Sequence, residues 1–353
     1  MAIDTTSVCT FSNQIEDADF GYPKQPKNKK MKQINICMLF GKKTALPLYT
    51  NIFNGSINDV TLFPKCVKQY DLVSEKNIKY VLNHGMYSKK NIYFLLDNSK
   101  KFIISLPSTT NLKYDLIELS QHIYMNPKYT VYAPHSNLYG TTYHIKWDEK
   151  RHLWAHVYID VNQRTADHNK LQDKIFEMYN KIKDGPIKFE NMNEYLHFFT
   201  LRRRKNTNDE FIAKFKEDAL QDILAIESWF IFLTNEIKDA TEALRIYRQR
   251  DMVEKAFDIL KNRTQEENTV VHSSPSYSNK LFIGFLSLLL NSQIHKTMTE
   301  NNMKKKFTIT ELYFILKSIK KIKVKDIVVY SPLNAKHKDI LEKFKCPLPC
   351  DSI

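Results

Sequence analysis

Short apolar and alternating segments divide the first part of the chain into predicted strands and helices. Segments with the apolar or period-two pattern of β-strands lie at residues 1–9, 34–40, 46–53, 78–82 and 102–106. Between them, one helix is predicted to open at Asn58-Asp59 and run to about Tyr70, and Ser88 is predicted to cap a second helix through Leu96. This order of strands and helices favours a mixed α/β sheet flanked by helices.

From about residue 111 the pattern changes. Aromatic-rich segments predict a small antiparallel set of strands at residues 129–133, 141–147 and 153–160. Helices are predicted over 169–183 and 192–204, a strand over 229–234, and further helices over 246–261, over 278–295 and in the basic segment 307–324. The chain is expected to end in a basic C-terminal helical segment and tail at 301–353.

The predicted helix at residues 246–261 carries polar residues at a regular spacing. Steps of three, four and seven residues place these side chains within a sector of roughly 60° on an α-helix, and they are Tyr247, Arg250, Glu254 and Lys261. A carboxylate held among basic neighbours suits a divalent metal and a phosphodiester. The alternative is an ordinary charged face with an i,i+4 pair between Arg250 and Glu254.

The overall charge indicates a polyanionic partner. Lysine and arginine number 53 against 39 acidic residues, a formal net charge of +14, which suggests nucleic acid or an acidic membrane face. The longest apolar run, residues 281–290, is too short to span a bilayer. Because the N-terminus has no signal peptide and the five cysteines are scattered, we expect a cytoplasmic protein with reduced thiols.

The spacing Tyr247-x2-Arg250-x3-Glu254-x6-Lys261 resembles the signature around the last catalytic acid of bacterial insertion-sequence transposases. These are DDE enzymes with a ribonuclease H-like core. Further resemblances follow the family's order: the run Asp4-Thr5-Thr6-Ser7 resembles its first-acid strand, residues 39–62 its hairpin and first core helix, and residues 80–92 its second-acid motif. Together they cover about residues 1–107 and 226–296. The resemblance implies an α/β catalytic core built from residues 1–110 and 226–300, interrupted by an inserted β/α region at 111–225.

The resemblance implies transposition by metal-dependent DNA cleavage and strand transfer, which is a phosphoryl transfer. Two Mg²⁺ or Mn²⁺ ions would act in such a site, with Asp4 bridging them and Glu254 holding one. Tyr247, Arg250 and Lys261 would contact DNA phosphates near the cut end. The implied partners are the DNA of the element ends and of the target, without a membrane, and a homodimer that acts on paired ends.

The sequence departs from the family at its second acid. The flanking residues Val81-Leu82 and Gly85 align that acid with position 83, which is Asn83. A neutral carbonyl oxygen is a weaker Mg²⁺ ligand than a carboxylate, so activity is expected to be impaired. His84 and Asp97 are alternative donors, but imidazole suits softer metals and a predicted helix separates Asp97 from the strand end.

A second departure concerns the start of the sequence. Asp4 lies three residues from Met1, so we expect a chain shortened at its N-terminus, without the end-recognition domain that such transposases carry. A shortened chain with a substituted acid is also compatible with a different class of protein, a catalytically dead DNA-binding remnant of a transposase. A basic scaffold without a nucleic-acid role is a third alternative.

Overall fold

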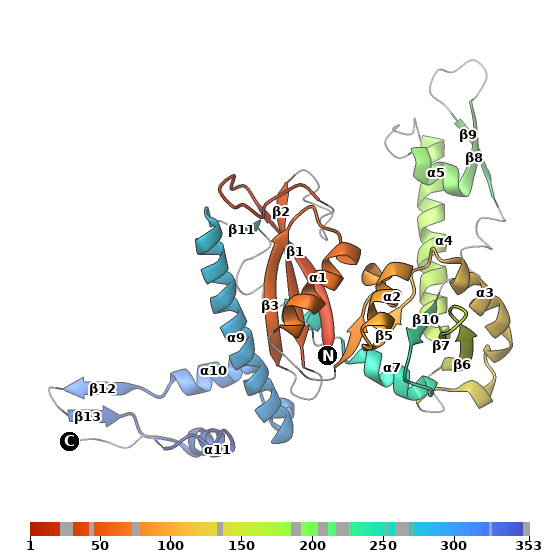
Figure 1. The fold of residues 1–353 in the computed structure, drawn as a ribbon. Helices are drawn as coiled ribbons and strands as arrows, with labels where there is room; N and C mark the ends of the chain where they lie inside the picture. The colour runs from red at the N-terminus through yellow and green to blue at the C-terminus, as the bar shows by residue number, and fades with distance from the viewer. Residues whose placement is uncertain are drawn as a thin grey trace. The chain divides into compact units, whose positions relative to one another are not determined.

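The computed structural model of the chain describes residues 1–21, 31–41, 46–72, 78–132, 137–184, 192–203, 211–216, 226, 228–250, 253–257, 268–269, 271–324 and 327–348. The chain forms two compact units. Residues 1–58 and 251–353 make up the first, which we call the terminal unit, and residues 59–250 make up the second, the central unit. Figure 1 labels the elements of both.

The terminal unit is built on an antiparallel meander of β1 (Ala2–Thr10), β2 (Lys32–Phe40) and β3 (Pro47–Asn54). The short strand β11 (Asn268–Thr269) pairs in parallel with the end of β1. All of β1 is buried, including its polar stretch from Asp4 to Ser7. The three strands expected in this part of the sequence are therefore confirmed.

The long helix α9 (Ser274–Glu300) runs beside β3 in the terminal unit (Figure 1). Two hydrogen bonds fasten its start to the residues after β1: the Ser12 hydroxyl donates to the His272 carbonyl oxygen at 2.6 Å, and the Glu16 amide donates to Ser274 Oγ at 3.0 Å. The predicted apolar helix at 278–295 lies within α9.

A small apolar cluster at the end of α9 holds the C-terminal elements. Its buried members come from α9, α10 (Ile309–Lys317), α11 (Ala335–Lys343) and the turn between α9 and α10, and they are Met298, Met303, Leu312 and Ile340. The predicted helix of the basic segment ends at Lys317, because residues 321–324 form β12 (Lys321–Val324), which pairs with β13 (Ile327–Tyr330). That hairpin was not predicted.

The central unit contains a five-stranded mixed sheet. Its strand order is β4 (Lys79–Leu82), β5 (Lys101–Ser105), β10 (Trp229–Thr234), β7 (His152–Asp160) and β6 (Leu138–Lys146). Strands β4 and β5 are parallel and are joined by α2 (Lys89–Asp97), whereas the other neighbours are antiparallel. Helix α1 (Asp59–Asp71) precedes β4, and the rings of Phe63 and Phe94 meet edge to face between α1 and α2.

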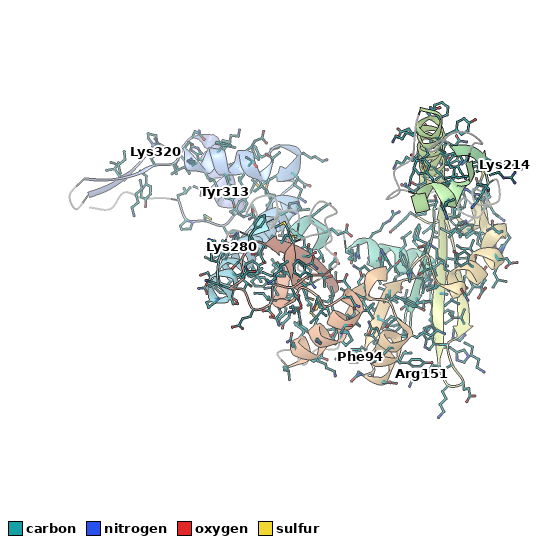
Figure 2. All side chains as sticks on the ribbon, turned by 90° about the horizontal axis from the view of Figure 1, so that it is seen from above. Phe94, Arg151, Lys214, Lys280, Tyr313 and Lys320 are labelled. Carbon is teal, nitrogen blue, oxygen red and sulfur yellow. The ribbon has the colours of Figure 1, made fainter. Side chains whose placement is uncertain are left out.

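The residues between β5 and β10 contribute α3 (Asn111–Ser120), β6, β7 and a lobe at the far end of α4 (Val161–Asp184) (Figure 1). The lobe consists of α5 (Met192–Phe198) and the hairpin of β8 (Phe199–Arg203) and β9 (Phe211–Phe215), which carries Lys214, labelled in Figure 2. Its core holds Met178, Ile182, Tyr195, Phe198 and Phe199.

The prediction of a mixed α/β sheet flanked by helices is confirmed. Some local predictions are wrong. Of the strand predicted at 129–133, the described residues 129–132 form none: Asn126 caps a short 3-10 helix, Pro127–Tyr129, and a single bridge joins Thr130 to Tyr139. The helix expected over 192–204 ends at Phe198, because β8 pairs with β9 from the next residue. The predicted boundaries of the four sequence parts stay a prediction.

Two further expectations concern the thiols and the membrane. Cys9 and Cys346 are free, but Cys37 and Cys66 are disulfide-bonded, so the expectation of reduced thiols is wrong for these two. Among the described residues, no helix combines the length and apolar character that crossing a bilayer requires.

A fully buried histidine joins three segments of the central unit. His156 on β7 contacts Thr142 Oγ1 on β6 through Nδ1 at 2.8 Å and the carbonyl oxygen of Ile237 through Nε2 at 3.1 Å. Because a carbonyl only accepts, Nε2 must carry the proton, and Nδ1 then accepts from the threonine hydroxyl. Burial lowers the pKa of His156 from 6.5 to about 4, which the Ile237 contact and the charge of Asp239 offset only in part.

This histidine predicts acid sensitivity of the fold. Below pH 6.5 the unfolded chain takes up a proton that folded His156 excludes, so the free energy of unfolding is expected to fall by about 3 kcal/mol between pH 6.5 and about 4. Urea denaturation at several pH values measures this. The dependence should vanish in His156→Gln and persist in His152→Gln, an exposed histidine on the same strand; the same slope in both variants contradicts the assignment.

Candidate functional site

The first predicted acid lies on a buried strand. Asp4 is 8% exposed near the start of β1, opposite Met38 on β2, and its Oδ1 accepts a hydrogen bond from the amide of Thr5 at 2.9 Å. Glu254 belongs to the same unit and lies in a helical segment, residues 253–257, with its own side chain exposed. The two carboxylates predicted to bind metal are thus one buried and one solvent-facing group of the terminal unit.

The helix predicted at 246–261 is not continuous. Helix α7 spans Ala240–Arg248, and the Arg250 amide donates to the carbonyl oxygen of Tyr247, three residues back, at 2.9 Å. This tight turn ends the α-helical pattern. Helix α7 buries Ala243, Leu244 and Ile246, whereas the segment 253–257 buries residues in the other unit. Lys261 lies outside the described residues.

Tyr247 and Arg250 form one stacked arrangement in the central unit. The ring of Tyr247 stacks on Phe232 of β10 with centroids 4.0 Å apart and an interplanar angle of 22°. The Arg250 guanidinium lies 5.7 Å from the centroid of the Tyr247 ring. A guanidinium held against an aromatic ring is restricted in direction and keeps its full charge. The sheet therefore orients a cation through a tyrosine.

Several polar contacts hold the segment between β10 and α7 against the sheet. The Asn235 side chain bonds the Phe102 amide at 3.1 Å and the Lys100 carbonyl oxygen at 2.9 Å. The Glu236 carboxylate pairs with Lys79 and Lys101, the first residues of β4 and β5, at 2.6 Å each. These contacts, together with the His156 bond to Ile237, fix where α7 begins.

Asn83 lies where β4 ends. It precedes the short 3-10 helix η2 (His84–Met86), and its carbonyl oxygen accepts from the Met86 amide at 3.2 Å. Ser88, two residues after the end of η2, caps α2 by accepting from the Asn91 amide at 3.0 Å, which confirms the predicted cap. The residue is thus placed at a strand end, where the sequence predicted the second acid.

A buried carboxamide fastens this turn to helix α1. Asn91, which is 2% exposed, donates from its side-chain nitrogen to the carbonyl oxygens of Val60 and Met86, both at 2.8 Å. Val60 is the second residue of α1 and Met86 the last residue of η2. One side chain therefore holds the start of α1 beside the turn that carries Asn83.

Gly85, in the same turn, lies close to two side-chain oxygen atoms. A β-carbon built on Gly85 would lie 3.2 Å from Asp59 Oδ2 and 3.3 Å from Asn83 Oδ1. Glycine leaves this space to the two oxygens. A carboxylate and a carboxamide oxygen are the hard donors that Mg²⁺ prefers, so these groups fit a divalent cation. Among the described residues, no group of three or more His, Cys, Asp or Glu side chains converges on a metal position.

The alternative donors suggested by the sequence are placed differently. Asp97 ends α2, and its Oδ1 pairs with the guanidinium of Arg151 at 2.6 Å. His84 is exposed in η2. Asp97 therefore already neutralises a cation of its own, and Asp59 is the carboxylate found beside Asn83.

A cavity of about 470 Å³ opens beside the start of α2. Its lining combines aromatic side chains and two exposed lysines with the first residues of α2 and α3, and consists of Tyr87, Lys89, Tyr93, Thr110, Asn111, Leu112, Ile145, Lys146 and Trp147. Helix N-termini carry a positive partial charge that adds to the lysines. Arg151, labelled in Figure 2, lies with its guanidinium 5.5 Å from the Tyr93 ring. Such a surface suits a ligand that combines negative charge with a flat ring.

A family model for the transposase DDE domain matches residues 1–290. The chain belongs to this transposase family. No curated protein matches it significantly. Among solved structures it is similar to the piggyBac transposase in a synaptic complex with hairpin DNA, at 13% identity and a TM-score of 0.40, over 85% of this chain and 48% of that one. The chain thus spans about half the length of that transposase.

Family membership gives the position of Asn83 its meaning. A DDE transposase is named for three acids, and this chain has an amide at the end of β4, where the sequence analysis expected the second of them. The structure places Asp59 near the same turn, which the sequence analysis did not anticipate. The sequence marked it only as the opening of a helix, and no local signal indicates that α1 begins beside residue 83.

The clamp on this turn predicts a large effect of one substitution. Asn91→Ala removes the donor of two carbonyl oxygens, so the free energy of unfolding should fall by about 1–3 kcal/mol. Asn98→Ala is a matched control, because the exposed Asn98 at the end of the same helix donates to one carbonyl oxygen, that of Phe94. Urea denaturation compares the two variants; equal stabilities would rule out the clamp.

Proposed function

We propose that this transposase acts on DNA ends by metal-dependent cleavage and strand transfer, as an insertion-sequence enzyme does. The observation that carries the proposal is the match of the DDE transposase family to residues 1–290, together with the place of Asp4 on the first strand of an α/β core. The net charge of +14 supports a polyanionic substrate. A homodimer on paired ends is part of the proposal.

In this function Asp4, Asn83 and Glu254 are the residues that would hold the metal. Bound Mg²⁺ or Mn²⁺ supplies activation of a water or a 3′-hydroxyl and stabilisation of the leaving oxygen. The burial of Asp4 fixes its carboxylate and excludes water from one side of it. Asn83 contributes only a neutral oxygen, so metal affinity is expected to be lower than with an aspartate at this position.

The side chains that would contact DNA phosphates are cations whose direction the fold restricts. Arg250, held on the ring of Tyr247, would contact a phosphate near the cut end, with Lys261 following in the sequence. Lys89 and Lys146 at the cavity are further candidates for phosphate contacts, because both are exposed and two helix N-termini open beside them. Aromatic residues at the same cavity suit stacking on a base.

The amide at residue 83, where the family has an acid, suggests a second candidate function. A transposase remnant that binds DNA without cutting would retain the basic surface and lose metal affinity. Residue 83 separates the two functions, since a carboxylate there restores the family's acid.

Nicking of DNA tests the proposed function. The substrate is a labelled duplex that carries the DNA bordering the coding sequence, with Mg²⁺ or Mn²⁺. We expect the natural chain to nick slowly, Asn83→Asp to nick faster by roughly tenfold, and Glu254→Ala to fall to background. Cutting by Asn83→Asp alone would indicate the DNA-binding remnant, and undiminished cutting by Glu254→Ala would overturn the site.

Salt dependence of DNA binding tests the lysines of the cavity. A lysine that neutralises one phosphate adds about one unit to the slope of log K against log salt. Lys89→Gln and Lys146→Gln are therefore each expected to reduce that slope by about one. Lys65→Gln, an exposed lysine on α1, is the matched control and should leave the slope unchanged. Fluorescence anisotropy at several salt concentrations measures it; three equal slopes would place the DNA elsewhere.

A further inference from the structure

We propose that the C-terminal elements form a second DNA-binding surface, which contacts phosphates without reading the base sequence. These elements are residues 303–348, called here the basic module. They lie beyond residue 290, where the family match ends. The inference rests on the proposed function only for the choice of DNA as the polyanion, and it involves neither the metal ligands nor the cavity.

The positive charge of the chain is concentrated in this part. Residues 301–353 contain twelve lysines against five acidic residues, a net charge of +7, which is half of the +14 carried by the whole chain. Two of the carboxylates have other partners: Asp339 pairs with Lys343 at 2.7 Å, and Glu311 accepts from the amide and the hydroxyl of Thr308 at 2.7 and 3.0 Å. The lysines therefore create a concentrated positive field, which attracts a polyanion.

The basic module has a small core of its own, which fixes where its lysines lie. Helices α10 and α11 pack on the end of α9 through the apolar cluster described above. Both helices begin with a capping box, at Thr308 and Asn334. Exposed cations on packed elements are a more rigid binding surface than the same cations on a loose tail.

Four exposed lysines come from segments that meet at one junction, and they are Lys320, Lys321, Lys336 and Lys338. In the first turn of α11, His337 places Nε2 2.8 Å from Ser318 Oγ at the end of α10. The first two lysines follow Ser318 closely in the chain, and the other two flank His337. This contact therefore holds the backbone of both pairs at the same end of the module.

The hairpin β12–β13 extends beyond α10 and α11 (Figure 1), and its base is closed by two hydrogen bonds of 2.9 Å between Lys320, labelled in Figure 2, and Ser331. Lys321 is paired across the hairpin with Tyr330, and its Nζ lies 6.0 Å from the centroid of that ring, which restricts the direction of the cation. A two-stranded ribbon fits the major groove of duplex DNA. Because an isolated hairpin is marginally stable in water, contact with DNA would also stabilise it.

The side-chain cations of this module are all lysines, since residues 301–353 contain no arginine. Lysine binds phosphate as a compact point charge, whereas arginine supplies the planar fork for bidentate recognition. Phosphate contacts position a duplex and carry no sequence information. The basic module is therefore expected to hold DNA of any sequence, such as target DNA, and not to select the element ends.

An ordinary solvated surface is the alternative reading of these lysines. Lysines that only keep the chain soluble would leave the affinity for DNA unchanged when they are neutralised. An acidic membrane surface is a different polyanion that attracts lysine clusters. Measuring DNA duplexes and lipid vesicles with the same variants separates these possibilities.

The test uses the full chain and measures binding at several salt concentrations. The probes are a duplex of random sequence and a duplex that carries the DNA bordering the coding sequence, both by fluorescence anisotropy, and vesicles of phosphatidylserine and phosphatidylcholine by cosedimentation. The two C-terminal variants are Lys320→Gln with Lys321→Gln, and Lys336→Gln with Lys338→Gln. The matched control removes the same charge from two exposed lysines of the central unit, Lys65→Gln with Lys170→Gln. Circular dichroism and thermal unfolding establish that each variant is folded.

We expect each C-terminal variant to reduce the slope of log K against log salt by about two, because each lysine that neutralises a phosphate contributes about one. The reduction should be the same on both duplexes, and the control should match the natural chain. Unchanged slopes in both C-terminal variants, or no binding of the natural chain to the random duplex, overturn the proposal. A reduction confined to the bordering duplex or to the vesicles also overturns it.

Nicking distinguishes a failure of this proposal from a failure of the proposed function. At saturating DNA the C-terminal variants should nick as fast as the natural chain, since their substitutions change binding and not the metal site. Reduced slopes without nicking, in the natural chain and in Asn83→Asp, leave the second DNA surface standing and overturn the proposed function. Nicking with unchanged slopes does the reverse.

Discussion

The geometry of the central unit around residue 83 depends on one buried carboxamide. Asn91 spends both hydrogens of its side-chain nitrogen on carbonyl oxygens that belong to different segments, Val60 in α1 and Met86 in η2. Buried carbonyl oxygens without a donor are costly, so this side chain stabilises the contact between the two segments. Through these two hydrogen bonds, α1 is held against the strand–helix–strand unit of β4, α2 and β5.

A second set of contacts decides where helix α7 begins. Strand β7 contributes His156 and Tyr158, which bond the carbonyl oxygens of Ile237 and Ala240. Burial raises the pKa of the Tyr158 hydroxyl, so this group stays a donor. Strand β7, from the region between β5 and β10, therefore holds the segment that leads into α7. The start of α7 in turn sets the positions of Tyr247, near the end of this helix, and of Arg250 in the turn that follows it.

The sequence pattern predicted most strands and helices of the core, because each has its own periodicity and its own breakers. It also placed Asp4 on a strand and Asn83 at a strand end, since both properties are local. It failed where tertiary contacts decide. The end of α7 at Arg248 coincides with the tight turn from Tyr247 to Arg250, and β8 forms where β9 pairs with it. The position of Asp59 beside Asn83 was equally hidden, since it depends on Asn91.

The contacts of Asn91 also bear on the order in which the chain folds. They join residues 31 and 5 positions apart, whereas the bond from Asn235 to the Phe102 amide closes a separation of 133 positions. Closing a long loop costs more entropy and is slow, while short-range contacts form early. On a ribosome, the segment from α1 to β5 can take its shape before the insertion is complete. Docking of β10 and α7 is then the late step, and the cation-bearing half of the site arrives last.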